Sequence, residues 1–115
     1  MNQAFHATLR PIHSRVIIDL QGEINAFANQ ELQAVYEQAE NGASKTIFLN
    51  FEQVSYINST GIAMIVEILK KARQSQRRIV AYGLSEHYIE IFDISRLSDY
   101  IGIYPDESAA LEANS

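Results

Sequence analysis

The sequence predicts an α/β domain built on a mainly parallel sheet. Stretches with strand character alternate along the chain with stretches in which apolar residues recur at helical spacing. Residues 46–49, Thr-Ile-Phe-Leu, carry consecutive apolar side chains, as do strands that are covered on both faces. The 115 residues are 47% hydrophobic and 20% charged and include no cysteine, so they can form one core without disulfides. Right-handed crossovers should then place helices over the faces of the sheet.

The first third of the chain predicts an N-terminal β pair followed by a helix. Residues 8–12 and 16–20 have strand character, and the polar turn His13-Ser14-Arg15 separates them. Gly22-Glu23-Ile24-Asn25 should form a turn that leads into the helix, and Asn41-Gly42 should end it. Its inward residues at helical spacing are Ala28, Leu32, Val35, Tyr36 and Ala39.

The second helix is expected after the buried strand 46–49. It should begin near Thr60 and end at about Gln74. Its predicted inward stripe consists of Ile62, Ile65, Val66 and Leu69.

The last part of the chain predicts two more strands and two more helices. Residues 79–83 and 101–104 should be strands. Ser85 is a candidate N-cap for a third helix, and Asp106 for a terminal helix that runs through Leu111. The third helix should carry Tyr88, Ile91, Phe92 and Ser95.

The junction Ile57-Asn58-Ser59-Thr60-Gly61 is the most informative segment for function. A β-branched apolar run ends there and the pattern of the second helix begins. Two hydroxyls should therefore lie at a helix N-terminus on the surface, where backbone N–H groups and the helix dipole favour an added anion. This placement predicts a phosphorylation site, and chemistry alone allows either Ser59 or Thr60.

The same junction resembles the Asp-Ser-Ser/Thr-Gly signature of the STAS domains, the family of bacterial anti-sigma factor antagonists and of the cytoplasmic tails of sulfate transporters. The Gly22-Glu23-Ile24 turn and the spacing of the later elements agree with that family. The resemblance implies a single STAS domain over residues 1–115, with a mainly parallel central sheet, an N-terminal β pair and about four helices. It also implies that Ser59 is the phosphoacceptor, with Thr60 as the adjacent hydroxyl and Gly61 as the close-packed start of the helix.

The resemblance further implies a stand-alone anti-sigma factor antagonist that works by partner switching. Its partner would be an anti-sigma factor or ATP-binding switch serine kinase, with a serine phosphatase as a further candidate partner. Phosphorylation of Ser59 would inactivate it. The partner-binding surface would comprise the loop around Asn25 and the outer face of the second helix. Helical spacing of about 100° per residue places Met64 opposite the inward stripe, as an exposed apolar contact. The predicted partner-binding residues are Asn25, Asn58, Ser59, Thr60, Gly61 and Met64.

Asparagine occupies three positions at which the family commonly carries aspartate: Asn25, Asn50 at the end of the buried strand, and Asn58. An asparagine can neither act as a base nor neutralise a metal ion, so phosphorylation would be slow or absent. Alternatively, Asn25 and Asn58 cap helices and hold turns, for which asparagine serves as well as aspartate. A second function therefore stays open, that of a STAS scaffold or small-ligand sensor, for a nucleotide or a lipid, that is never phosphorylated.

Enzyme chemistry is not expected from this sequence. A nucleophile elbow requires glycine two residues before the serine, where this chain has Ile57. His6, His13 and His87 suggest neither a triad nor a ligand pair, and neither a Walker loop nor a dinucleotide fingerprint is present. The sequence therefore predicts no intrinsic catalysis, no cofactor and no metal.

The net charge and the hydropathy of the chain limit which further classes of partner we expect. The net charge of -5 argues against nucleic acid and anionic lipid. The N-terminus resembles no signal peptide and no segment is apolar enough to insert into a membrane, so we expect a cytoplasmic protein and not a transporter tail. The resemblance to the soluble STAS proteins implies a monomer when free. Basic residues cluster near the end of the second helix, which favours complementation of the helix dipole over a docking patch. They are Lys70, Lys71, Arg73, Arg77 and Arg78.

Overall fold

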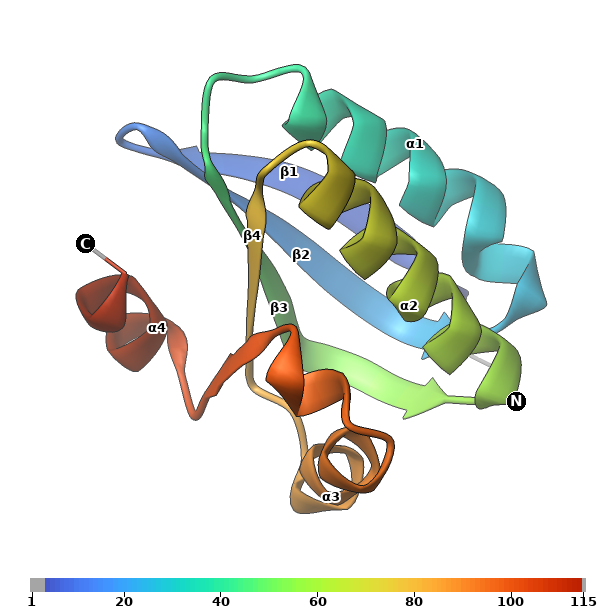
Figure 1. The fold of residues 1–115 in the computed structure, drawn as a ribbon. Helices are drawn as coiled ribbons and strands as arrows, with labels where there is room; N and C mark the ends of the chain where they lie inside the picture. The colour runs from blue at the N-terminus through green and yellow to red at the C-terminus, as the bar shows by residue number, and fades with distance from the viewer. Residues whose placement is uncertain (1–3, 115) are drawn as a thin grey trace.

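The computed structural model describes residues 4–114 and contains one mixed five-stranded sheet in the order β1-β2-β3-β4-β5 (Figure 1). β1 (His6–Ile12) pairs antiparallel with β2 (Arg15–Ile24). From β2 onward every pairing is parallel, through β3 (Thr46–Ile57), β4 (Arg78–Tyr82) and β5 (Gly102–Tyr104). The predicted α/β architecture with an N-terminal β pair is confirmed.

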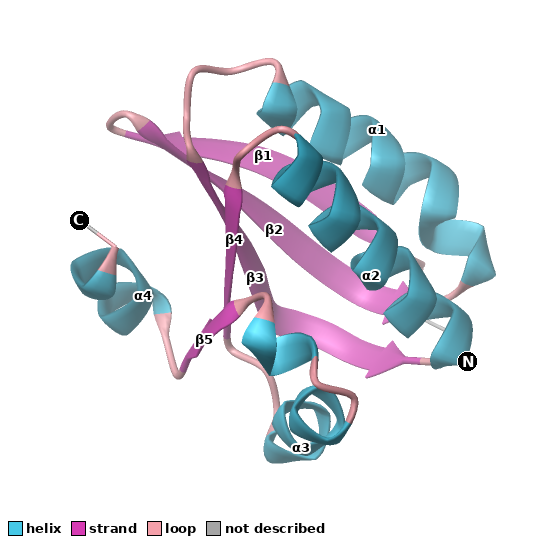
Figure 2. Cartoon of the chain, viewed as in Figure 1, coloured by secondary structure: helices cyan, strands magenta, loops and turns pink. Residues whose placement is uncertain are grey.

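The helices cover the two faces of the sheet unequally (Figure 2). α1 (Asn29–Glu40) and α2 (Ser59–Gln74) lie side by side over one face, and α3 (Glu86–Ile94) lies beyond the end of β4. The short α4 (Glu107–Ala113) lies on the opposite side of the sheet. Two single-turn 3₁₀ helices, η1 (Ala26–Ala28) and η2 (Leu97–Asp99), join these elements. Within the described residues no helix is both long and apolar enough to cross a bilayer.

The main hydrophobic core lies between the sheet and the layer of α1, α2 and α3. The predicted inward residues of the first helix are all buried there, as the 3.6-residue period requires. A smaller core lies beneath α4 on the other face. It consists of Ile17, Phe48, Val80, Tyr82 and Ala110.

Two strands are longer than the sequence suggests. β3 continues past residue 49 to Ile57, so Asn50 lies within the strand and not at its end. Polar residues interrupt the apolar run after residue 51 because one face of this part of β3 is exposed, while Phe51, Val54 and Ile57 still pack on the core. The turn predicted at residues 22–25 is wrong for Gly22, Glu23 and Ile24, which all lie in β2. Gly22 has φ 90° and lies beside a register shift of the β2–β3 ladder. Glycine adopts this left-handed conformation without steric cost, which lets the strand bulge and continue.

The orientation predicted for α2 is right for Ile65 and Leu69, which are buried, and wrong for the rest of the predicted stripe and for Met64. Met64 is 6% exposed and belongs to the main core, whereas the predicted inward residues Ile62 and Val66 are only partly buried. The buried arc is turned by about one residue around the helix axis. It is centred on the row of small and apolar residues Gly61, Met64, Ile65, Ile68, Leu69 and Ala72. Gly61 packs closely against the Ile24 carbonyl oxygen of β2, so this row of α2 faces the sheet.

The two C-terminal helices begin where the sequence predicts. Their other ends differ slightly, because α3 ends at Ile94, one residue before Ser95, and α4 continues past Leu111 to Ala113. Asp106 Oδ1 accepts a hydrogen bond from the Ala109 amide at 2.9 Å and caps α4. Ser85 occupies the N-cap position of α3, although its side chain makes no capping hydrogen bond.

Candidate functional site

The junction before α2 lies where two parallel strands end together. Ile24, the last residue of β2, is paired in register with Ile57, the last residue of β3. The Asn58 amide donates to the Ile24 carbonyl oxygen at 3.2 Å. Asn25 and Asn58 therefore leave the sheet side by side at the carboxyl ends of neighbouring parallel strands, which is where open α/β sheets place their functional loops.

Both asparagines are helix caps. Asn58 Oδ1 accepts from the Gly61 amide at 2.8 Å, at the start of α2. Asn25 Oδ1 accepts from the Phe27 amide at 3.0 Å and caps η1. Each amide oxygen satisfies a backbone donor that has no partner within its own helix. The capping role predicted for these two residues is confirmed.

Gly61 allows the start of α2 to approach the end of β2. A β-carbon placed on Gly61 would lie 2.2 Å from the Ile24 carbonyl oxygen and 2.9 Å from Ile57 Cγ2. Both distances are far inside van der Waals contact, so this position requires glycine. The predicted close-packed start of the helix is confirmed.

The two hydroxyl residues of the junction face solvent. Ser59 and Thr60 are exposed in the first turn of α2, and neither hydroxyl has a hydrogen-bond partner within residues 4–114. First-turn amides of a helix lack intrahelical acceptors and carry its positive dipole end. A phosphate attached to either hydroxyl would meet this favourable end of the helix.

Phe27 is an exposed aromatic residue beside the junction that sequence reasoning missed. Its side chain is 96% exposed, whereas Met64, the apolar contact predicted from the sequence, is buried. Phe27 belongs to η1, which directly follows Asn25 and contacts both β2 and α2. A sequence signal exists, because Phe27 shares a helical row with the polar and small residues Glu31, Ala34 and Gln38, opposite the inward stripe.

The comparison with known proteins identifies the family. The sequence profile of the STAS domain matches residues 7–110. This chain belongs to the STAS domain family. Among its relatives, an anti-sigma-B factor antagonist of Listeria monocytogenes is 33% identical over 82 residues, which are 71% of this chain and 72% of the relative. The protein of the same description from Staphylococcus aureus is 29% identical over 82 residues, which are 71% of this chain and 76% of the relative.

Solved structures share the fold of this STAS domain. The anti-sigma factor antagonist SpoIIAA in its unphosphorylated form superposes with a TM-score of 0.74 at 23% identity, over 95% of this chain and 96% of that one. The Bacillus cell fate determinant SpoIIAA in its phosphorylated form gives a TM-score of 0.72 at 24% identity, over 97% of this chain and 100% of that one. At these identities the likeness concerns the fold alone.

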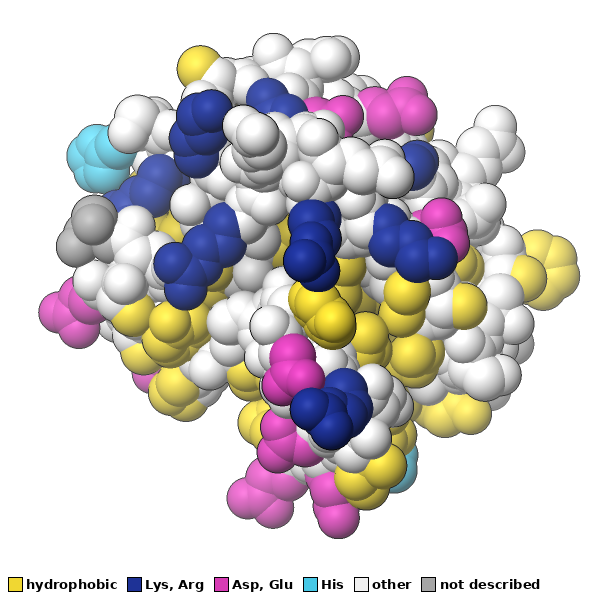
Figure 3. All heavy atoms as spheres, viewed as in Figure 1, with side chains coloured by type: hydrophobic (Ala, Val, Ile, Leu, Met, Phe, Trp, Pro, Cys, Tyr) yellow, Lys and Arg dark blue, Asp and Glu magenta, His cyan; other side chains and the backbone are white. Residues whose placement is uncertain are grey.

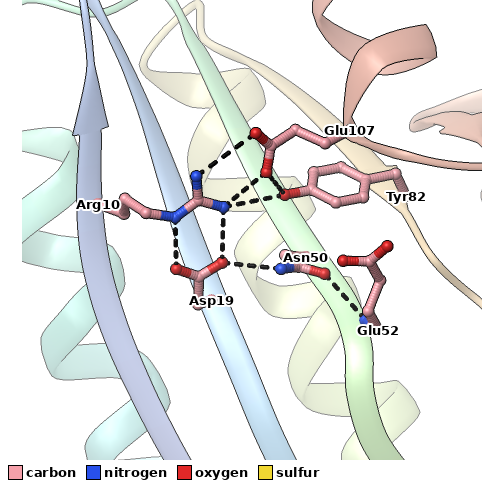
Figure 4. Close-up of polar contacts among 6 residues, drawn as sticks. All are labelled: Arg10, Asp19, Asn50, Glu52, Tyr82 and Glu107. Atoms are coloured by element: carbon pink, nitrogen blue, oxygen red, sulfur yellow. Dashed lines mark hydrogen bonds and ion pairs between the residues drawn. The ribbon is translucent and has the colours of Figure 1, made fainter.

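Asn50 of the STAS domain does not lie at the Ser59 junction. It belongs to a polar network that crosses the opposite face of the sheet beneath α4 (Figure 4). The Asn50 side-chain amide donates to Asp19 Oδ1 at 2.8 Å, and its oxygen accepts from the Glu52 backbone amide at 2.9 Å. An aspartate at this position would instead bring a second carboxylate against Asp19. The asparagine is therefore explained by its neighbour in β2.

The rest of this network ties α4 to the sheet. Arg10 binds both oxygens of Asp19, at 2.7 and 3.0 Å, and Glu107 Oε1 of α4 at 2.7 Å. Tyr82 donates to the same Glu107 oxygen at 2.7 Å. The hydrogen bonds from Arg10 hold the pKa of Asp19 below its usual range, and those from Arg10 and Tyr82 do the same for Glu107. Burial, reinforced by Glu107, raises the pKa of Tyr82.

The three histidines of the STAS domain lie on different elements. His6 is on β1, with Nδ1 4.0 Å from a Glu31 carboxylate oxygen, and His13 is in the β1–β2 turn. The exposed ring of His87 on α3 packs edge-on against Tyr88. No contact joins two histidines in the described part of the chain.

Proposed function

We propose that this chain is a single STAS domain that acts as a phosphorylation-regulated anti-sigma factor antagonist. In its unmodified form it binds an anti-sigma factor or ATP-binding switch kinase and releases the client of that partner. Phosphorylation of Ser59 ends the binding. The observation that carries the proposal is the exposed, unpartnered Ser59 hydroxyl at the start of α2, beside the Asn25 loop. The relatives described as anti-sigma-B factor antagonists support it.

The docking surface that we propose consists of Asn25, Phe27, Asn58, Ser59 and Thr60. Gly61 contributes by bringing α2 against β2, so that the two loops form one continuous surface. Phe27 takes the role of apolar anchor, because large aromatic residues that become buried on binding dominate interface energies. Met64 is left out of this surface because the main core already buries it.

The switch acts through charge. The γ-phosphoryl group of ATP would pass to Ser59 Oγ, with ADP as the leaving group. The hydroxyl proton would go to a base of the partner kinase, because neither Asn25 nor Asn58 can accept it. The phosphate adds about 1.5 to 2 negative charges. The helix N-terminus stabilises this charge within the free domain, whereas docking would have to desolvate it.

Mapping the phosphate in the native host tests this proposal. Protein purified from that host would be analysed by intact-mass spectrometry with site mapping, as wild type and as the Ser59→Ala, Thr60→Val and Asn58→Asp variants. We expect one phosphate on Ser59, absent from Ser59→Ala, retained in Thr60→Val and enriched in Asn58→Asp. Ser59→Ala should keep its partner in a pull-down, whereas Ser59→Asp should weaken binding. Equal partner binding by these two variants would contradict the switch.

A second candidate function rests on the two capping asparagines. Asn25 and Asn58 both make their capping hydrogen bonds as neutral side chains, so the junction needs no carboxylate at either position to keep its shape. This favours a STAS scaffold or ligand sensor that is never phosphorylated. Absence of phosphate under all growth conditions, with partner binding intact in Ser59→Asp, would select this function.

A further inference from the structure

A basic groove lies at the other end of α2. Lys70, Arg73, Arg77 and Arg78 line it, so it gathers four of the nine lysine and arginine residues of a chain whose net charge is -5. Figure 3 shows Lys and Arg side chains around a hollowed apolar patch in the middle of the visible face. The dipole of α2 would account for basic residues in its last turn. It does not account for Arg78 at the start of β4, or for the groove that these residues share.

The floor of the basic groove is apolar. It consists of Val66, Leu69, Ile79 and Leu97, and Tyr100, which is 59% exposed, forms one wall. The groove has a volume of about 660 Å³, within the size range of pockets that bind small organic ligands. A hydrophobic floor with a few convergent polar groups at the rim is the usual composition of such pockets.

The cations of the basic groove differ in how far they are already engaged. Arg77 donates to the Ser44 and Gly42 carbonyl oxygens, and the ammonium of Lys70 lies 3.6 Å from a Glu67 carboxylate oxygen. The Arg73 guanidinium lies over the ring of Tyr100, 5.4 Å from its centroid, which holds it at the rim. Arg78 has no hydrogen-bonding or ionic side-chain partner within residues 4–114.

One carboxylate also lines the basic groove, but it is paired. Asp99 Oδ2 accepts from Arg96 Nε at 3.2 Å. The rim therefore keeps an excess of positive charge, with Arg73 and Arg78 available to an anion. Guanidinium groups bind carboxylates and phosphates through two parallel hydrogen bonds.

We propose that the basic groove binds a small amphiphilic anion, with its phosphate or carboxylate held by Arg73 and Arg78 and its apolar body on the floor. An inorganic anion would leave the apolar floor unused, and a neutral amphiphile would leave the guanidinium groups without a counter-ion. Ser59 and Arg73 are 14 positions apart on one helix, about 20 Å at 1.5 Å per residue. The groove is therefore separate from the docking surface, and this proposal does not rest on the phosphorylation of Ser59.

Titration with n-octyl phosphate below its micellar concentration tests the proposal. Binding would be measured by calorimetry and by amide chemical shifts, with inorganic phosphate and octyl glucoside titrated in parallel. The test variant is the double substitution Arg73→Gln and Arg78→Gln, which changes two exposed side chains. The matched control is Lys45→Gln, an exposed cation outside the groove.

We expect saturable binding of octyl phosphate, with the largest shifts at Val66 and at residues 97–100. The dissociation constant should rise at least tenfold in the double variant and stay within twofold in Lys45→Gln. Neither inorganic phosphate nor octyl glucoside should bind comparably. Each of three outcomes would overturn the proposal. Octyl phosphate could bind wild type and double variant with equal affinity, it could show no saturable binding, or the protein could bind only to vesicles of anionic lipid.

Discussion

The backbone amide of Ile57 donates a hydrogen bond to the phenolic oxygen of Tyr88 at 2.8 Å, in the buried interior. Ile57 is the last residue of β3 and Tyr88 lies in the first turns of α3, 31 positions later. The bond satisfies a strand-end amide on the side away from the β2 ladder. It also fixes the residue directly before Asn58, so α3 helps to hold the Ser59 junction in place.

Replacing Tyr88 by phenylalanine should destabilise the domain. The substitution removes the oxygen and leaves the buried Ile57 amide unsatisfied, at a cost of about 1 to 3 kcal/mol. The free energy of unfolding from urea titration measures this loss. Tyr56→Phe is the control, because Tyr56 is 51% exposed and should change stability by less than about 0.5 kcal/mol. Equal stability of Tyr88→Phe and wild type would show that the bond contributes nothing.

Gly61→Ala should be far more damaging than Gly42→Ala. The added methyl group at Gly61 would overlap the Ile24 carbonyl oxygen, so β2 and α2 must separate, whereas at Gly42 the nearest atom is 3.4 Å away. We expect a loss of about 3 kcal/mol or more at Gly61 from overpacking. At Gly42 we expect a change of less than about 1 kcal/mol. Thermal unfolding of both variants measures the difference, and similar melting temperatures would refute the close approach.

The polar network around Arg10 should make the stability of the domain depend on pH. Because the folded state depresses the pKa values of Asp19 and Glu107, their contribution is complete above the ordinary carboxyl pKa near 4. It is lost as the pH falls through the lower pKa values of the folded state. When the pH is lowered past about 4, the free energy of unfolding of the wild type should therefore decrease.

Arg10→Leu tests the origin of this pH dependence. The Arg10 side chain is 39% exposed, so solvent screens its ion pairs, and we expect a cost of about 1 to 2 kcal/mol at pH 7. The difference between wild type and variant should shrink at pH 3, because the depressed pKa values make both carboxyl groups bind protons less readily in folded wild type than in the unfolded chain. Urea titrations at the two pH values measure it. A difference that is the same at both would show that Arg10 acts through packing and not through charge.

Phe27 and Met64 form a matched pair for separating docking from folding. Met64→Ala should cost about 2 to 5 kcal/mol of stability, because it leaves a cavity in the main core. Phe27→Ala should leave the free energy of unfolding within about 0.5 kcal/mol, since its side chain is already exposed. In a partner pull-down, however, Phe27→Ala should lose binding. Full binding by Phe27→Ala would remove Phe27 from the docking surface.

Periodicity and capping patterns of the sequence were sufficient for most of the fold. The alternation of strands and helices, the inward row of α1 and the caps at Asn58 and Asp106 all depend on contacts within a few residues. Such local patterns are readable without knowledge of the rest of the chain. The exposure of Ser59 and Thr60 follows from the same reasoning, because a helix that starts directly after a strand begins at the carboxyl end of the sheet, on the surface.

The features in which the structure differs from the sequence prediction all involve contacts between segments that are distant along the chain. The side of α2 that faces the core was decided by Gly61 packing on the Ile24 carbonyl, which no pattern within the helix records. β3 extends to Ile57 because β2 bulges at Gly22 and continues beside it. Likewise, the place of Asn50 was set by Asp19, 31 positions away.

The sequence by itself therefore determined the α/β class, the order of the elements and the two hydroxyls at the start of α2, since hydrophobic period and capping are local properties. Only the tertiary structure decided that Met64 is buried, that Phe27 is exposed, and that Arg73 and Arg78 share a groove with Tyr100. Rotation of a helix about its axis and the meeting of distant segments depend on the packing of the whole core. That packing is a property of all the elements together.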